Sequence, residues 1–414
     1  MITVKPFNAL RPTPELVSKC AALPYDVMSS SEAREMVKDN PYSFLRVDRA
    51  EINLDTGVDI YSDVVYQTAK KTLDSYEENG VYINDTEKKY YFYRQIMGEQ
   101  SQTGIVGCAS VDDYLENRIK KHEFTRADKE IDRIKHVDTC SAHTGPIFLA
   151  YKESDVLDKI IVEQTKKAPL YDFVSEDGVR HTVWTTDSGE IDRQIEAAFK
   201  ALDALYIADG HHRCASAVKV GTKRREEIGA YTGNEEFNYF LSVIFPASTL
   251  KILDYNRLIK DLNGYSIEDF LKILEEKIGK LTEYNEGKPY RPTKKHEVGV
   301  FVGGKWYQLE FYPEICNAPR AVDRLDCAIL QKNLLSAVLD IDDPRTNKRI
   351  DFAGGIRGLN YLEKRCNEDS VLAISMYPTS LDDLMAVADA GDVMPPKSTW
   401  FEPKLRSGIL IHKI

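Results

Sequence analysis

The stretch Ala204-Leu205-Tyr206-Ile207-Ala208-Asp209-Gly210-His211-His212-Arg213 passes from an apolar run to a polar pentapeptide. The apolar part predicts a buried strand, and residues 214–218, which follow it, predict a helix. A strand that ends in a glycine turn and opens a helix directs backbone N–H groups and the positive end of the helix dipole to one point. Two imidazoles and a guanidinium beside that point are suited to binding phosphate. Asp209 is placed to hold Mg²⁺ or to orient a hydroxyl nucleophile.

The composition is that of an ordinary soluble globular protein. The 414 residues are 43% hydrophobic and 29% charged, and a chain of this length is expected to form two or three domains. The N-terminus lacks a basic-then-apolar signal peptide, and no apolar run approaches the ~18 residues of a membrane span. The seven scattered cysteines include no C-x-x-C pair, which argues against a zinc ribbon or a disulfide framework. We therefore expect a cytoplasmic protein with free thiols and no membrane partner.

The net charge of −11, from 55 basic and 66 acidic residues, disfavours nucleic acid as a partner. Binding to nucleic acid needs a clustered basic face, and the short run Lys223-Arg224-Arg225 is followed at once by two glutamates. A small anionic ligand is still compatible with this charge, because only the field at its pocket matters. The expected partners are therefore small molecules, with a homodimer left open.

Strand and helix patterns are mixed along the chain. Residues 88–95 and 104–111 predict a hairpin. Further strands are expected at 146–151, 180–185, 204–208, 239–245, 297–302, 305–311 and 371–377. Capping-box patterns predict helices that start at Ser29, Asp187, Ser266 and Ser380, and helical periodicity covers 266–281 and 325–339. This mixture predicts an α+β (mixed α/β) fold rather than a TIM barrel or a doubly wound sheet.

Two polar tracts in the first third of the chain are candidates for a site. Pro24-Tyr25-Asp26-Val27 is typical of a turn but is also rich in polar groups. In Lys121-His122-Glu123-Phe124-Thr125, the Glu123 carboxylate is a candidate base whose pKa burial and cations could tune. If the next segment is helical, Lys129, Asp132 and Arg133 share one face. The alternative for this second tract is a capped helix start with solvated ion pairs.

A third tract, Met394-Pro395-Pro396-Lys397-Ser398-Thr399-Trp400-Phe401-Glu402-Pro403-Lys404, lies near the C-terminus. Its prolines fix an extended backbone that presents Lys397, Ser398 and Thr399 in succession, as a clamp on phosphate oxygens would require. It is not a Walker A loop, because the glycines of that motif are missing. The competing interpretation is a rigid tail that packs its aromatic residues.

These motifs, in this order, resemble a bacterial and archaeal family known as domain of unknown function 1015. The resemblance covers essentially the whole chain and rests on Pro24-Tyr25-Asp26-Val27, His122-Glu123-x-Thr125, Ile207–Arg213 and Pro395-Pro396-Lys397-Ser398-Thr399-x-Phe401. The Asp-Gly-His-His-Arg element is also similar to the signature of ParB/sulfiredoxin-like nucleotide-binding domains, including free-serine kinases built on that fold.

The resemblance implies phosphoryl transfer between ATP or ADP and free L-serine, a reaction that could also run in reverse and release serine from phosphoserine. It further implies a ParB/sulfiredoxin-like core at 116–260, between an N-terminal α/β region at 1–115 and a C-terminal α/β region at 261–414 whose tail closes on the site. Sulfiredoxins carry a cysteine where this chain has His211, so the thiol for sulfinic-acid repair is missing. No helix-turn-helix reader with a basic surface accompanies the turn either.

The expected roles follow from this resemblance and from the chemistry of each side chain. Glu123 is the preferred base, with Asp26 second, and Asp209 is expected to hold Mg²⁺ or the serine amine. The remaining site residues are assigned by group. Catalysis is expected to involve His211 and His212 as well; nucleotide phosphates are expected to contact Gly210, His212, Arg213, Lys397, Ser398 and Thr399; and the substrate is expected to contact Asp26, His122, Thr125 and Arg133.

Two other function classes stay open. A ParB-like nucleotide-binding switch would use the same turn without any base, so loss of Glu123 would not affect it. A phosphohydrolase built on the two histidines is the third option. Adjacent histidines point to different faces of a helix, which disfavours a two-histidine metal site.

Overall fold

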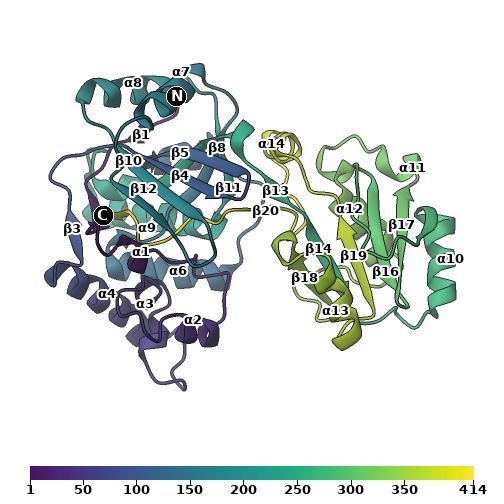
Figure 1. The fold of residues 1–414 in the computed structure, drawn as a ribbon. Coiled ribbons are helices and arrows are strands. Elements are labelled where there is room, and N and C mark those ends of the chain that lie inside the picture. The colour runs from purple at the N-terminus through teal and green to yellow at the C-terminus, as the bar shows by residue number, and fades with distance from the viewer. The chain divides into compact units, whose positions relative to one another are not determined.

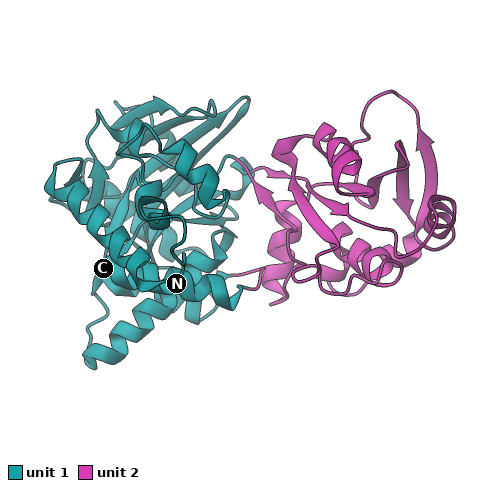
Figure 2. Cartoon of the chain, turned by 90° about the horizontal axis from the view of Figure 1, so that it is seen from below, with its two compact units in different colours: residues 1–120, 125–250, 403–414 teal, residues 121–124, 251–402 magenta.

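The computed structural model describes residues 1–414 and has the mixed α/β fold predicted from the sequence (Figure 1). The chain forms two compact units, shown in different colours in Figure 2. Unit 1 consists of residues 1–120, 125–250 and 403–414, and unit 2 of residues 121–124 and 251–402. No helix combines the length and the apolar character that crossing a lipid bilayer requires.

Unit 1 is built on a nine-stranded mixed sheet with the order β6-β11-β8-β12-β5-β4-β10-β9, in which β1 also pairs with β5. A four-stranded sheet, β3-β2-β21-β7, places the C-terminal strand between β2 and β7. The strands of unit 1 are β1 (Val4–Lys5), β2 (Ala9–Pro12), β3 (Tyr82–Asn84), β4 (Tyr91–Met97), β5 (Gln100–Ser110), β6 (Ile119–Lys120), β7 (Ala142–His143), β8 (Ile147–Tyr151), β9 (Tyr171–Val174), β10 (Arg180–Thr185), β11 (Leu205–Asp209), β12 (Tyr239–Pro246) and β21 (Ile411–Lys413).

The predicted hairpin is confirmed as the antiparallel pair β4–β5, whose last register pair is Met97 with Gln100. The helices of unit 1 are α1 (Val17–Cys20), α2 (Ser30–Met36), α3 (Leu45–Asp48), α4 (Asp63–Glu78), α5 (Val111–Leu115), α6 (Ala127–Cys140), α7 (Asp155–Gln164), α8 (Gly189–Lys200) and α9 (His211–Ile228). The three-region division of the chain stays a prediction. The large sheet draws strands from both 1–115 and 116–260, so most of these two regions lies together in unit 1, whereas residues 121–124 and 251–260 lie in unit 2.

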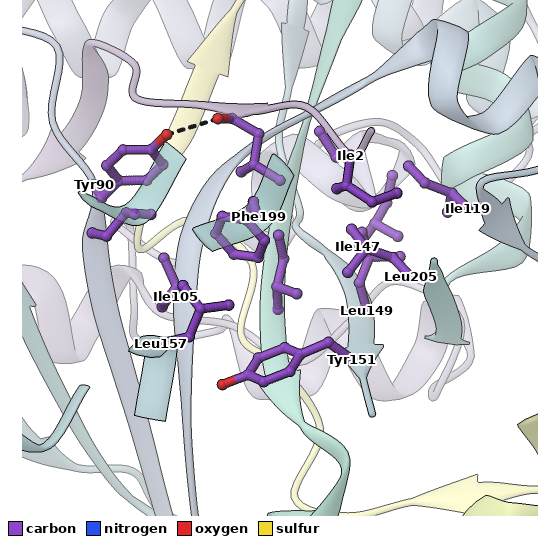
Figure 3. Packing of buried hydrophobic residues seen from close by; sticks show 14 of the residues in the cluster. Ile2, Tyr90, Ile105, Ile119, Ile147, Leu149, Tyr151, Leu157, Phe199 and Leu205 are labelled. Atoms are coloured by element: carbon purple, nitrogen blue, oxygen red, sulfur yellow. Dashed lines mark hydrogen bonds between the residues drawn. The ribbon is translucent and has the colours of Figure 1, made fainter. Parts of the chain in front are cut away.

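The main core of unit 1 packs helices α7, α8 and α9 against the large sheet. Leu157 of α7 and Phe199 of α8 are fully buried beside Ile105 and Leu149 of the sheet (Figure 3). Each such side chain contributes roughly 1.5–3 kcal/mol through removal of apolar surface from water. Tyr90 has its hydroxyl satisfied inside this core, because the O–H donates to the Val4 carbonyl at 2.7 Å. This packing fixes β11, and with it the start of α9.

Unit 2 is built on an antiparallel six-stranded sheet with the order β15-β17-β16-β19-β14-β18, and a short ribbon pairs β13 with β20. Its strands are β13 (Ile252–Leu253), β14 (Tyr255–Ile259), β15 (Gly279–Tyr284), β16 (Glu297–Val302), β17 (Lys305–Phe311), β18 (Ile350–Gly354), β19 (Leu372–Met376) and β20 (Trp400–Phe401). Its helices are α10 (Ile267–Lys277), α11 (Pro313–Cys316), α12 (Asp326–Leu330), which continues as a π-helical turn over Gln331–Ser336, α13 (Asn360–Glu368) and α14 (Leu381–Asp389).

Four helix starts were predicted from capping patterns, and the structure shows a helix at or next to each of them. Capping boxes at Ser29 and Ser380 are confirmed, and the Ser266 hydroxyl accepts the N–H of Asp269 at 3.1 Å. The start expected at Asp187 is wrong by one residue, because Ser188 is the N-cap of α8. A cap of this kind stabilises a helix by about 1 kcal/mol.

The helix expected over 266–281 is too long at its C-terminal end. α10 stops at Lys277, and Gly279 begins β15 opposite Phe311 of β17. A Cβ at position 279 would lie 2.1 Å from the carbonyl oxygen of Glu310, so only glycine permits this close strand approach. The apolar pattern of 278–281 therefore belongs to the sheet.

Candidate functional site

The turn between β11 and α9 has the strand–glycine–helix form predicted from the sequence (Figure 1). Gly210 has a φ of 88°, a left-handed conformation that glycine adopts without a steric penalty. Its N–H donates to Asp209 Oδ1 at 2.8 Å, which fixes the carboxylate at the strand end. The 18-residue helix α9 begins at His211, so its first backbone N–H groups lack partners within the helix.

Asp209 forms an ion pair with Lys404, whose Nζ donates to Oδ2 at 3.0 Å. The side chains are 32% and 12% exposed, so the pair is partly shielded from water. Burial alone would raise the pKa of Asp209, but Lys404, Arg213 and the Gly210 N–H outweigh burial and hold this pKa well below its usual range. Asp209 is therefore a fixed anion at neutral pH. Lys404 is the last residue of the C-terminal tract and was not among the predicted site residues.

Arg213 points into the interior of unit 1. Its Nη1 donates to the Pro146 carbonyl at 2.6 Å, and its guanidinium lines a cavity of about 20 Å³ together with Tyr25 and Arg133. These three residues come from the Pro-Tyr-Asp-Val tract, from the segment after Thr125 and from the Asp-Gly-His-His-Arg turn. The structure thus brings parts of three separate polar tracts to one cavity.

His212 joins the turn to the segment before α6. Its Nε2 accepts the backbone N–H of Arg126 at 3.0 Å, so the ring proton is on Nδ1 when the imidazole is neutral. The Thr125 hydroxyl in turn donates to Glu130 Oε2 at 2.7 Å, and Glu130 forms an ion pair with Lys219 of α9. His212 therefore positions the Thr125 segment, while His211 is buried at the helix start.

The second tract continues into α6, and Lys129, Asp132 and Arg133 share one face of this helix as expected. All three line a cavity of about 40 Å³. The guanidinium of Arg133 lies 4.1 Å from the centroid of the Tyr25 ring and pairs with Asp132 at 2.8 Å. Asp132 also accepts the Tyr66 hydroxyl at 2.9 Å. Asp132 and Arg133 are buried and Lys129 is partly exposed, so this face of α6 forms a charged wall, while the helix also carries exposed ion pairs such as Arg126–Asp128.

The other predicted site residues lie in different surroundings. Asp26 is exposed in the turn that follows buried Tyr25. His122 and Glu123 belong to the 121–124 segment of unit 2, where the His122 carbonyl accepts the Met394 N–H at 2.8 Å. Residues 394–402 of the third tract are also in unit 2, where the Ser398 hydroxyl donates to the Pro395 carbonyl at 2.6 Å. The roles expected for these residues stay predictions.

Comparison with known proteins identifies a family whose matched residues include the first two polar tracts and the Asp-Gly-His-His-Arg turn, while the third tract lies outside them. The family described as "Protein of unknown function (DUF1015)" matches residues 4–328. No curated protein matches the chain.

Three solved structures are similar at low identity. C-terminally truncated SbnI from Staphylococcus aureus is 10% identical, with 74% of this chain and 87% of that chain covered and a TM-score of 0.39. A free serine kinase variant in complex with AMP is 15% identical, with 73% and 90% covered and a TM-score of 0.36. A conserved hypothetical protein from Pyrococcus furiosus is 16% identical, with 73% and 93% covered and a TM-score of 0.35.

Proposed function

The chain belongs to the DUF1015 family, and we propose that it is a phosphotransferase that moves a phosphoryl group between ATP or ADP and free L-serine. The observation that carries this proposal is the turn at the start of α9, where the Asp209 carboxylate pairs with Lys404 and the charge of Arg213 further favours the anion. L-Serine as the acceptor comes from the motif resemblance. Phosphoryl transfer depends mainly on positioning and on charge neutralisation, and this turn is suited to both.

The nucleotide phosphates are proposed to bind at the N-terminus of α9. The N–H groups of residues 211–213 and the helix dipole favour a negative charge there. Lys404 and Arg213 add two cations that neighbouring structure holds in place. His212 contributes position rather than charge, because its Nε2 accepts a backbone N–H. Lys397, Ser398 and Thr399 remain proposed as further phosphate contacts.

Glu123 is proposed as the general base that accepts the serine hydroxyl proton. A carboxylate with a strongly lowered pKa is a poor base, and this argues against Asp209 in that role. The Asp209 anion is better suited to the serine ammonium group or to Mg²⁺. The choice of Glu123 rests on the chemistry of its carboxylate and on its place in the second tract, two residues before Thr125. Asp26 stays the second candidate.

Mg²⁺ is proposed to accompany the nucleotide. No group of three or more His, Cys, Asp or Glu side chains forms a protein-only metal site. Mg²⁺ in such enzymes is held by one or two carboxylates together with substrate phosphates, so the single Asp209 carboxylate fits this role. The ion would neutralise phosphate charge, and the Lys404 ammonium, which bonds to the same carboxylate, would share that task.

The acceptor is proposed to contact the α6 wall of unit 1. Thr125 and Arg133 are retained as substrate residues, and His122 and Asp26 as further predicted contacts. Arg133 lines both cavities described above, and this is the observation that supports acceptor binding there.

The test is incubation of the purified chain with L-serine, Mg²⁺ and ATP, ADP or CTP, with phosphoserine detected by mass. We expect phosphoserine with at least one nucleotide, and none when L-alanine, which lacks the hydroxyl, replaces L-serine. Tight nucleotide binding without phosphoserine from any of the three would overturn the proposal. That result would favour the nucleotide-binding switch.

A further inference from the structure

Arg257 of β14 is a buried cation in unit 2 whose contacts are all neutral. The residue is 3% exposed. The guanidinium donates to the Tyr255 carbonyl and lies 5.4 Å from the centroid of the Phe352 ring. An arginine stays charged in proteins, and a buried charge without a counter-ion is costly. Burial lowers the pKa of Arg257, and only Cys327 and Tyr255 oppose that effect.

Arg257 lies on the face of the unit 2 sheet opposite its apolar cluster. The cluster takes Leu258 and Ala353 from β14 and β18. Side chains alternate along a strand, and the register pairs Arg257 with Phe352, so these two share the other face. Tyr255, two residues before Arg257, lies on that face as well. This face is packed as well, because Arg257 is also paired with the fully buried Ile374 of β19, so the guanidinium is a charge held among apolar side chains.

A second cation reaches the same face from the third tract. Lys397 is exposed, and its Nζ lies 5.7 Å from the centroid of the Tyr255 ring. Its φ of 60° is a left-handed conformation that costs a residue with a side chain about 1 kcal/mol or more. Ser398 holds this conformation, because its carbonyl accepts the Thr379 hydroxyl at 3.0 Å and its own hydroxyl donates to Pro395 at 2.6 Å. Strain maintained in this way is typical of ligand sites.

We propose that Arg257 and Lys397 form an anion site in unit 2 that binds a phosphate group. Two cations match a phosphate dianion better than a carboxylate, and the planar guanidinium can bind two phosphate oxygens at once. The Cys327 thiol borders this site but stays neutral, since burial raises its pKa, so it supplies no competing anion. The inference extends the proposed phosphate contact of Lys397 to a site of its own, and it does not require phosphoryl transfer to occur.

Hydrogen exchange of the full-length protein, read by mass spectrometry, tests this site with inorganic phosphate and with ADP in separate arms. We expect phosphate-dependent protection of peptides that cover β14 and residues 395–401. Arg257→Met should weaken this effect at least about tenfold, as loss of a charge-assisted hydrogen bond predicts. Without ligand it should leave the melting temperature unchanged or raise it, because an unpaired buried charge is removed. The matched control is Arg345→Met, which removes an exposed unit 2 arginine paired with Asp343 at 2.9 Å and should keep the full effect.

Protection with both ligands would identify the phosphate group itself as the ligand, and protection with ADP alone would identify the nucleotide as its source; either result supports the site. If Arg257→Met does not fold, exposed Lys397→Gln should show the same weakening. Equal protection in wild type and variant, or no protection with either ligand, would overturn the proposal. If the protein makes no phosphoserine but still shows this protection, the proposed function is contradicted and the anion site is not.

Discussion

Lys404 Nζ lies 3.0 Å from Asp209 Oδ2, although 195 residues separate the two in sequence. The segment 403–414 returns to unit 1 and ends in β21, which pairs with β2 and β7. The cation beside the Asp209 turn is therefore supplied by the last residues of the chain. Through Lys404, this segment contributes a side chain to the candidate phosphate site.

Replacing Lys404 with Met should destabilise the protein and weaken nucleotide binding. Asp209 would lose its counter-ion and its pKa would rise, since burial would then be less strongly opposed. An unsatisfied, partly buried charge costs roughly 1–3 kcal/mol, which urea unfolding would measure. Lys413→Met is the control, because its pair with Glu77 is exposed and should contribute less than about 1 kcal/mol. Equal losses in the two variants would show that the Asp209 pair has no special role.

Arg213→Lys should reduce phosphoserine formation far more than conservation of charge suggests. An ammonium lacks the planar fork that can hold the Pro146 carbonyl and a phosphate oxygen together. We expect kcat/KM to fall by roughly tenfold or more, about 1.4 kcal/mol. If steady-state kinetics gave a wild-type kcat/KM for this variant, the proposed contact between Arg213 and phosphate would be wrong.

Gly210→Ala should impair phosphate binding in addition to stability. Gly210 and Gly229, at opposite ends of α9, both have positive φ, so alanine at either should cost about 1 kcal/mol or more. Only at position 210 would the new Cβ also crowd a site group, 3.2 Å from Arg213 Nε, whereas at position 229 nothing lies within 4 Å. Nucleotide titrations should therefore show weaker binding in Gly210→Ala but not in Gly229→Ala. Equal nucleotide affinities in the two variants would mean that the shape of the Gly210 turn does not control phosphate binding.

Stability should fall as the pH drops below the ordinary histidine pKa of ~6.5. Burial lowers the pKa of four histidines, His136, His143, His181 and His412, and that of His181 to about 3. Because these folded-state values lie below the unfolded value, the unfolded chain binds more protons as the pH falls, and stability present above ~6.5 is lost. One histidine that stays neutral contributes a loss of about 2 kcal/mol between pH 7 and pH 5.

Urea unfolding at these two pH values checks this dependence, with His181→Gln as the comparison. Gln cannot titrate but can still bond to Tyr93 or Ser175, the neighbours of His181. The variant should lose about 2 kcal/mol less than wild type over the same interval. An identical loss in both proteins would exclude His181 as a source of the pH dependence.

The strand–turn–helix at residues 205–228 could be predicted because its signals are local. The apolar run, Gly210 and the periodicity after it need no tertiary information. The N-cap of α8 was missed by one residue because Asp187 and Ser188 are both good caps, and their packing decides between them.

The long-range features could not be predicted from one sequence. Neither the Asp209–Lys404 pair nor the shared cavity of Tyr25, Arg133 and Arg213 leaves a local pattern. The burial of Arg257 without a counter-ion could not be predicted for the same reason, because an arginine in a strand is normally expected to be exposed or paired. Burial and ion pairing depend on the fold. A single sequence shows which residues could be buried or paired, but not which of them are.

The rate of phosphoserine formation by wild type and by Glu123→Gln distinguishes a base-catalysed phosphotransferase from a nucleotide-binding switch. The substitution keeps the shape of the side chain but removes its ability to accept a proton. Under matched, saturating nucleotide and L-serine, wild type should turn over, and Glu123→Gln should be slower by ~10² to 10⁴ while it binds both ligands nearly as well. Normal turnover in Glu123→Gln would contradict the base assignment, with Asp26→Asn the next variant to measure. Absence of phosphoserine in the wild type with every nucleotide would contradict the proposed phosphotransferase itself.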